Sequence, residues 1–351
     1  MSRERKFYEA VNEALDLCLA RDAAVYVMGL GVPDPKGIFG TTVGLAQKYG
    51  PDRVSDMPTS ENGMTGICIG SALVGMRPIM IHQRFDFALL AMDQIVNQAA
   101  KWHYLFAGKA RIPLTIRLIV GRGWGQGPQH CQSLHAWFAH IPGLKVVLPA
   151  SPRDAKGLLI AAVRDDNPVI VVEHRWLHQT YGEVPADAYE TPIGEAAIVR
   201  EGRDVSLVAV SHMVLEALRA AEFLSAHGIE AEVLDLRSIA PLDRDAIEAT
   251  VRRTGHLLVA DIGWTGFGLS AEVITTVVER AHQALKAPPR RIALPDVPIP
   301  TTPALSKYCY PDAWDLARAA AEMLGHHDLQ LPNRPADAKL DVPDPSFTGP
   351  F

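Results

Sequence analysis

The sequence predicts an α/β protein made of two parallel-sheet domains. Short, continuous apolar segments alternate with amphipathic helical segments, which is typical of parallel strands covered by helices on both faces. This alternation stops in a stretch rich in Gly and Pro near 180–195 and then restarts. The chain has 351 residues, enough for two domains of ordinary size. We therefore predict a first domain at 1–185 and a second at 186–328.

The predicted elements of the first domain alternate in type along the chain. They are helices at 6–20, 64–75, 88–104 and 152–163, and strands at 24–29, 78–81, 114–120, 146–149 and 169–173. The helix at 64–75 is rich in Gly and Ser, which would let another backbone approach it closely. A loop with several Gly and Pro residues is expected at 34–42.

The second domain repeats the same pattern. Strands are expected at 205–210, 231–236 and 256–261, with Ser211 as the cap of a helix that follows the first of them. The segment 329–351 is polar and rich in Pro, and has too little apolar periodicity to fold alone. We expect it to be an extended C-terminal tail.

Composition excludes several classes of protein. The formal charge is −6 and no run of Lys or Arg forms a basic patch, which argues against nucleic-acid binding. The most apolar stretch, 64–76, is too short to span a bilayer, and the N-terminal segment lacks the apolar core of a signal peptide. The four cysteines are far apart and form no Cys-x-x-Cys pair. We therefore expect a cytoplasmic protein with free thiols and no membrane partner.

Seven short motifs occur in a fixed order along the chain. They are Tyr-Gly-Pro-Asp-Arg-Val at 49–54, Ser-Glu-Asn-Gly at 60–63, Asp-Gln-Ile-Val-Asn at 93–97, His-Cys-Gln-Ser at 130–133, and the segments 138–147, 235–243 and 296–300. Together they resemble the β subunits of thiamine-diphosphate-dependent 2-oxo acid dehydrogenases, the family of the pyruvate, branched-chain and acetoin enzymes. The resemblance covers roughly residues 5–325. It implies a transketolase-like pyrimidine-binding domain followed by a transketolase C-terminal domain.

The resemblance also implies a second subunit. In such enzymes an α subunit holds the cofactor's diphosphate and Mg²⁺ through a Gly-Asp-Gly…Asn motif, and no Gly-Asp-Gly occurs in this chain. We therefore expect an α₂β₂ heterotetramer in which this chain binds only the pyrimidine half of thiamine diphosphate.

Glu61 matches the catalytic glutamate of the family. A carboxylate hydrogen-bonded to the pyrimidine N1′ favours the tautomer in which the cofactor's own 4′-amino group removes the thiazolium C2 proton. The simpler interpretation is a Glu at a helix N-terminus, stabilised by the helix dipole.

Three further residues are expected to bind the cofactor. Phe87 matches the family's aromatic residue on the pyrimidine ring, and Phe85 and Gln83 are its neighbours; an ordinary core position is the alternative for both phenylalanines. Here the family's usual Gln-Phe-Ala-Asp pattern is replaced by Gln-Arg-Phe-Asp at 83–86. Arg84, together with His82, would bind an anionic group of the substrate, face solvent or face the α subunit.

His130 matches the active-site histidine of the family's β subunits. It is expected to orient the substrate carboxylate and to handle a proton or the acyl group. A structural histidine in a Gly-rich loop is the alternative, and the spacing of the nearby Cys and His residues fits no common zinc site. We interpret the loop at 121–127 as a flexible substrate-side loop, because its Gly spacing is not that of a dinucleotide cradle.

Asp165 and Asn167 match positions that hold a structural monovalent cation, such as K⁺, in branched-chain members of the family. The alternative is a turn that ends a helix, where Asp and Asn are common.

The leading functional hypothesis is decarboxylation of a 2-oxo acid with transfer of the acyl group to a lipoyl acyltransferase. A two-subunit transketolase-like or acyloin-forming carboligase, which needs no lipoyl partner, is the alternative. A scaffold without activity is the third hypothesis, and the presence of both Glu61 and His130 speaks against it.

Overall fold

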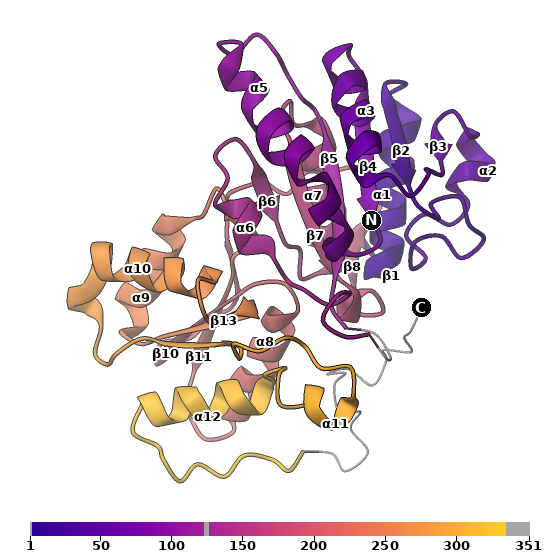
Figure 1. Ribbon diagram of the computed structural model, residues 1–351. Helices are drawn as coiled ribbons and strands as arrows, with labels where there is room; N and C mark the ends of the chain where they lie inside the picture. The colour runs from indigo at the N-terminus through magenta and orange to yellow at the C-terminus, as the bar shows by residue number, and fades with distance from the viewer. Residues whose placement is uncertain (1, 123–125, 335–351) are drawn as a thin grey trace. The chain divides into compact units, whose positions relative to one another are not determined.

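The computed structural model describes residues 2–122 and 126–334, which form two compact α/β units (Figure 1). The units divide between Ile193 and Gly194, a little beyond the boundary expected from sequence. The α/β class with two sheet domains is confirmed. No helix of the described residues is long and apolar enough to cross a membrane.

The first unit contains a parallel sheet with the strand order β6-β7-β5-β4-β2-β3. The strands are β2 (Val25–Gly29), β3 (Val54–Ser55), β4 (Arg77–His82), β5 (Thr115–Val120), β6 (Lys145–Val147) and β7 (Val169–His174). The three central strands β4, β5 and β7 are buried along almost their whole length. This explains why they read as continuous apolar runs rather than as alternating ones.

Helices cover this sheet. The helices of the unit are α1 (Phe7–Arg21), α2 (Leu45–Tyr49), α3 (Glu61–Leu73), α4 (Phe85–Ala88), α5 (Ala100–Leu105), α6 (His135–Ala139) and α7 (Pro152–Arg164). Helix α1 packs on α7, whereas α3 packs on β4 (Figure 1). Helix α7 begins where expected because Ser151 accepts a 3.0 Å hydrogen bond from the Asp154 N–H and Pro152 occupies the first turn.

The helix predicted at 88–104 is wrong in detail. The chain instead forms α4, a 3₁₀ turn at Leu89–Ala91, a π-helical segment at Gln94–Ala99, and α5. The loop residue Gly143 (φ +103°) packs closely against the first residue of α5. A Cβ atom at Gly143 would lie 1.9 Å from the carbonyl oxygen of Ala100. Apolar spacing predicts helical structure but cannot show such changes of pitch.

Two strands of the unit carry no apolar pattern and were not predicted. Strand β1 (Ser2–Lys6) pairs antiparallel with β8 (Tyr181–Pro185), and most residues of both strands are exposed or half-buried. The stretch near 180–195 is therefore partly a strand rather than only a linker.

The second unit contains a sheet with the order β14-β13-β10-β11-β9, parallel except for the edge strand β9. Its strands are β9 (Ala197–Arg200), β10 (Val205–Ala209), β11 (Ala231–Asp235), β13 (Leu257–Trp264) and β14 (Arg290–Leu294), and β12 (Ser238–Ala240) is a further short strand. Its helices are α8 (His212–Ser225), α9 (Arg244–Thr254), α10 (Leu269–Ala281), α11 (Pro303–Ser306) and α12 (Ala313–Met323).

Ser211 precedes α8 as predicted but does not cap it through its side chain. Its φ is +56° and its hydroxyl oxygen makes no cap hydrogen bond to the helix. The prediction of a side-chain cap is therefore wrong, because the backbone conformation of Ser211 differs from the extended one that capping requires.

The described part of the tail lies along α12. The Trp314 indole donates a 2.6 Å hydrogen bond to the Pro332 carbonyl, and Arg334 forms an ion pair with Asp312 at 3.0 Å. The rest of the predicted tail, 335–351, and the loop residues 123–125 lie outside the described residues.

Helix α8 holds the start of α12 through a buried carboxylate. Glu216 accepts a 2.9 Å hydrogen bond from the Ala313 N–H and pairs with Arg219 at 2.9 Å. Burial nevertheless raises the pKa of Glu216 to about 7, against the opposing effect of Arg219. The charged form is therefore disfavoured in the folded state.

We expect Glu216→Gln to stabilise the protein at alkaline pH. Because the pKa is raised on folding, the contribution of Glu216 is fully present below its unfolded pKa and is lost as the pH rises through about 7. The raised pKa corresponds to roughly 3 kcal/mol. The melting temperature of the native protein should fall between pH 5 and 8 more steeply than that of the variant. Parallel profiles for the two proteins would contradict this prediction.

Candidate functional site

Most predicted site residues follow the carboxyl ends of parallel strands in the first unit. Glu61 comes after β3, Gln83 and Phe87 come after β4, and His130 comes after β5. Because the strands are parallel, these ends lie at the same edge of the sheet. Ligands of open α/β sheets bind at this edge.

Glu61 is a buried carboxylate that has no partner among the described residues. It is the first residue of α3, and only 6% of its surface is exposed. None of the described residues forms a hydrogen bond or an ion pair with its side chain. A Glu that only balances a helix dipole is usually exposed to water, so the burial of Glu61 favours contact with a ligand.

Phe87 and His130 are brought together. Their ring centroids are 5.4 Å apart and the rings are nearly perpendicular, at 85°. Phe87 is half-buried and His130 is exposed, so both rings keep surface for a ligand.

A hydrogen bond also joins the segment that carries Phe87 to the loop that carries His130. The Gln132 side chain donates to Asp86 at 2.8 Å. Burial raises the pKa of Asp86, while the Gln132 bond and the nearby His130 oppose the rise. Asp86 and Gln132 were not among the predicted site residues, although both lie within motifs that were recognised.

Gln83 and Phe85 have structural roles in this chain. Gln83 donates a 2.6 Å hydrogen bond to the Leu30 carbonyl, which ties the end of β4 to the end of β2. Phe85 has no exposed surface and packs on Phe138 with ring centroids 5.1 Å apart. Of the two phenylalanines, Phe87 alone has surface to offer a cofactor.

Asp165 and Asn167 lie at the opposite edge of the sheet and form a turn. One Asp165 carboxylate oxygen accepts from the Asn167 N–H at 2.9 Å and from its amide at 3.2 Å, and the other pairs with Lys145. The Arg77 guanidinium donates to the Asp165 and Val163 carbonyls. These groups are thus engaged with protein donors, and the geometry lends no support to a cation here. The described residues contain no group of three or more His, Cys, Asp or Glu side chains that would hold a metal.

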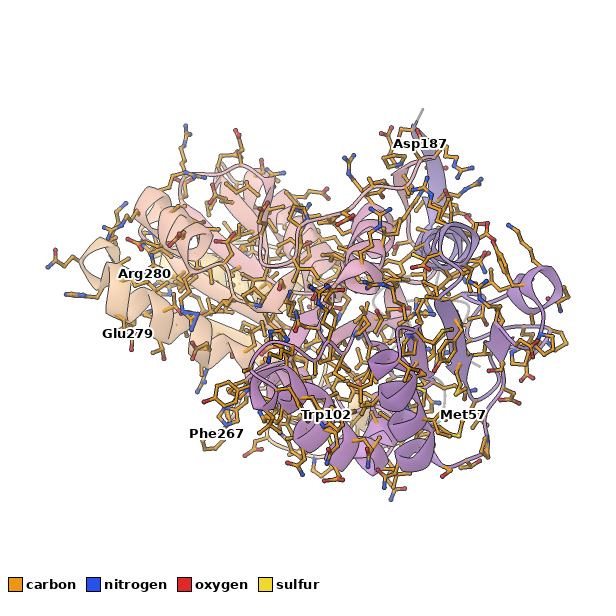
Figure 2. All side chains as sticks on the ribbon, turned by 90° about the horizontal axis from the view of Figure 1, so that it is seen from above. Met57, Trp102, Asp187, Phe267, Glu279 and Arg280 are labelled. Carbon is orange, nitrogen blue, oxygen red and sulfur yellow. The ribbon has the colours of Figure 1, made fainter. Side chains whose placement is uncertain are left out.

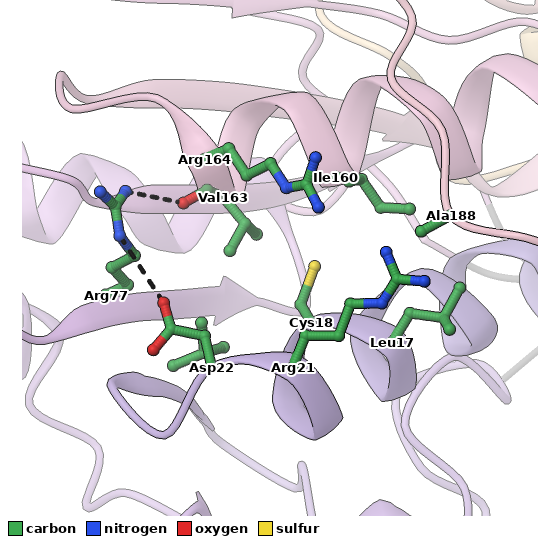
Figure 3. A pocket seen from close by; sticks show the side chains of 10 residues that line it. Leu17, Cys18, Arg21, Asp22, Arg77, Ile160, Val163, Arg164 and Ala188 are labelled. Atoms are coloured by element: carbon green, nitrogen blue, oxygen red, sulfur yellow. Dashed lines mark hydrogen bonds and ion pairs between the residues drawn. The ribbon is translucent and has the colours of Figure 1, made fainter.

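A pocket of about 230 Å³ also lies at this amino edge (Figure 3). It is lined by residues of α1, α7 and the starts of β2 and β4, among them Cys18, Arg21, Arg77 and Arg164. Burial raises the pKa of the Cys18 thiol to about 12, so it is protonated at neutral pH. The pocket contains none of the predicted site residues.

Several buried charges near the carboxyl edge were missed. Arg117 of β5 and Glu173 of β7 form a bidentate pair at 2.5 and 2.8 Å, with almost no exposed surface. Burial alone would raise the pKa of Glu173, but Arg117 and His178 outweigh it and lower the pKa to about 2. The sequence signal was a charged residue within each of two apolar strands.

His82 and Arg84 do not face solvent, which corrects one of the predicted alternatives. His82 is 2% exposed and Arg84 is 4% exposed. Burial lowers the pKa of His82 to about 4, so its ring is neutral at pH 7. Of these two residues, Arg84 alone carries a charge that would attract an anion.

Comparison with known proteins identifies the family of both domains. Residues 3–180 match the pyrimidine binding domain of transketolase, and residues 194–316 match the transketolase C-terminal domain. The chain is 44% identical to a mitochondrial pyruvate dehydrogenase E1 component subunit beta-1 of Oryza sativa, over 91% of this chain and 86% of the relative. It is 43% identical to the acetoin:2,6-dichlorophenolindophenol oxidoreductase subunit beta of Cupriavidus necator, over 92% and 98%.

The chain belongs to this family of transketolase-like β subunits. A solved structure has the same fold: a split-gene transketolase, described as an inactive beta4 tetramer, superposes with a TM-score of 0.75 at 23% identity. The superposition covers 92% of this chain and 98% of the other, which shows a shared fold.

In this β subunit we expect Gln132→Leu to lower activity through its effects on Asp86 and on the loop that carries His130. Loss of the donor raises the pKa of Asp86 further and loosens the loop that carries His130. In the enzyme assembled with its α partner, kcat/KM should fall about tenfold, and its acid limb should move to higher pH. Gln179→Leu, which removes a contact to Lys6 instead, is the matched control. A loss of activity without any change in the pH profile would contradict the prediction that the Gln132 bond affects activity through the protonation of Asp86.

Proposed function

We propose that the chain is the β subunit of a thiamine-diphosphate-dependent enzyme that decarboxylates a 2-oxo acid and passes the acyl group to a lipoyl carrier. The observation that carries the proposal is the buried Glu61 carboxylate, which has no partner among the described residues and starts a helix at the ligand edge of the sheet. The relatives named as pyruvate dehydrogenase E1 and acetoin oxidoreductase β subunits support it.

Thiamine diphosphate, when bound, supplies a nucleophilic thiazolium carbon and accepts the electrons released as carbon dioxide leaves. Glu61 would hold a proton at the pyrimidine N1′ atom. Its burial strengthens that hydrogen bond, because water competes poorly for it. Phe87 would pack against the pyrimidine ring with its half-buried face.

His130 would act on the substrate side. Its exposed ring is held edge-on to Phe87, and the Asp86–Gln132 bond fixes the loop that carries it. An imidazole in this position can orient the substrate carboxylate and take or give a proton.

The proposal includes an α subunit that holds the diphosphate and Mg²⁺ in an α₂β₂ assembly. It leaves K⁺ out, since Asp165 and Asn167 are satisfied within the chain.

Exposed apolar side chains support a partner subunit. Ile67 and Val74 of the α3 segment are 55% and 83% exposed, and Gly70 beside them faces open space. In the second unit Phe267 is fully exposed (Figure 2). The four cysteines are buried and form no disulfide, which suits a reducing compartment such as the cytoplasm.

Glu61→Ala should abolish activation of the cofactor. In the assembled enzyme the rate of C2–H exchange of bound thiamine diphosphate should fall by about 100-fold or more, as for loss of a general acid–base group. Proton NMR after acid quench in D₂O measures this rate. Asn62→Ala, at the exposed neighbouring position, is the control and should leave exchange unchanged.

An unaltered exchange rate in the Glu61 variant would refute the mechanism. An assay of the wild-type enzyme then shows which molecule accepts the acyl group. Acyl transfer from a 2-oxo acid to a lipoylated domain is the expected result, whereas transfer only to aldehydes would establish a carboligase.

The isolated chain should bind thiamine diphosphate poorly. The diphosphate and its Mg²⁺ contribute much of the affinity through charge, and this chain holds no Gly-Asp-Gly element for them. Calorimetric titration with thiamine diphosphate and Mg²⁺ should show strong binding only after the α subunit is added. Tight Mg²⁺-dependent binding by this chain alone would refute the divided site.

A further inference from the structure

Two buried arginines contact one aromatic ring at the carboxyl edge of the sheet. The Cζ atoms of Arg84 and Arg175 lie 5.1 and 4.8 Å from the centroid of Phe39. Arg84 is 4% exposed and Arg175 is 3% exposed. Arg84 follows β4 and Arg175 follows β7, so strand ends place both residues.

Arg84 lacks the partners that a buried guanidinium normally has. It forms no hydrogen bond or ion pair with any described residue, and its Nη1 atom is buried without an acceptor. A buried cation without a counter-ion is costly, and contact with an aromatic ring offsets only part of that cost.

The charged groups around Arg84 do not supply the missing anion. Burial raises the pKa of the neighbouring Cys131 thiol to about 11, so it is neutral at pH 7. Asp86 favours the charged form of Arg84 through space, but it forms no ion pair with Arg84 and accepts a hydrogen bond from Gln132 instead. Burial and the charge of Arg84 together lower the pKa of Arg175 to about 9. The nearby Glu173 is already paired with Arg117.

Arg84 is linked by sequence and by its neighbour Cys131 to the two segments that carry Phe87 and His130. Arg84 is three residues before Phe87, which contacts His130, and its neighbour Cys131 directly follows His130. His82, the other residue that would attract an anion at this strand end, is neutral at pH 7.

We propose that Arg84, beside Phe39 and Arg175, binds a second carboxylate of the substrate, so that the enzyme acts on 2-oxo acids with a carboxylate on the side chain. This inference rests on the proposed function. A guanidinium binds a carboxylate through two parallel hydrogen bonds, which would satisfy the buried N–H groups of Arg84. A site built for a charged group rejects an analogue that lacks it, because the buried cation is then left unpaired.

The test uses the assembled enzyme and compares two five-carbon substrates, 2-oxoglutarate and 2-oxopentanoate. Only 2-oxoglutarate has a carboxylate at the end of its side chain. We expect kcat/KM to be about 10- to 100-fold higher for the diacid. Arg84→Gln should abolish this preference while keeping kcat/KM for the monoacid within about threefold, and Arg84→Lys should retain part of it. Arg21→Gln, which removes an exposed arginine at the opposite edge, should change neither value.

A second measurement does not depend on the variants folding. Glutarate should raise the melting temperature of the wild-type enzyme, and butyrate at equal concentration should not. A wild-type preference for the monoacid, an equal loss for both acids in Arg84→Gln, or equal effects of glutarate and butyrate would overturn the proposal. Loss of turnover with all 2-oxo acids would overturn the proposed function instead, and the glutarate measurement would still decide whether Arg84 binds a carboxylate.

Discussion

The parallel pairing of β3, β2, β4, β5 and β7 is the constraint on which the rest of the first unit depends. It brings strand ends that are far apart in the sequence to one edge, where the loops with Glu61, Phe87 and His130 begin. The Arg117–Glu173 pair joins β5 to β7 inside this sheet. Breaking such a pair from one side leaves an uncompensated buried charge, so the pair helps to fix the register that positions the site.

The same edge concentrates buried charge, and the charges have different roles. Arg117 and Glu173 neutralise each other, and the Gln132 bond ties Asp86 to the loop with His130. Glu61 and Arg84 have no such partners among the described residues. Unpaired buried charges destabilise a protein unless a ligand or partner completes them. This contrast within one edge separates residues that stabilise the structure from the two residues for which we propose ligands.

Much of this could be predicted from the sequence because its signals are local. Continuous apolar strands indicated the parallel sheets, and the motifs around Glu61 and His130 indicated the family. Pairings between distant polar segments were not predictable: β1 pairs with β8 without an apolar pattern, and the pitch changes around Gln94–Ala99 depend on packing. The core position of Phe85 and the ion pair between Lys145 and Asp165 depend on tertiary contacts that a motif does not encode.

The central claim is that Glu61 of this chain serves a cofactor whose other end is held by a different polypeptide. An experimental structure of the assembled enzyme with thiamine diphosphate and Mg²⁺ tests it most directly. The account predicts the Glu61 carboxylate within hydrogen-bonding distance of N1′, with the diphosphate and Mg²⁺ on the α subunit. A cofactor held entirely by one protomer, or a Glu61 carboxylate remote from the pyrimidine, would contradict it.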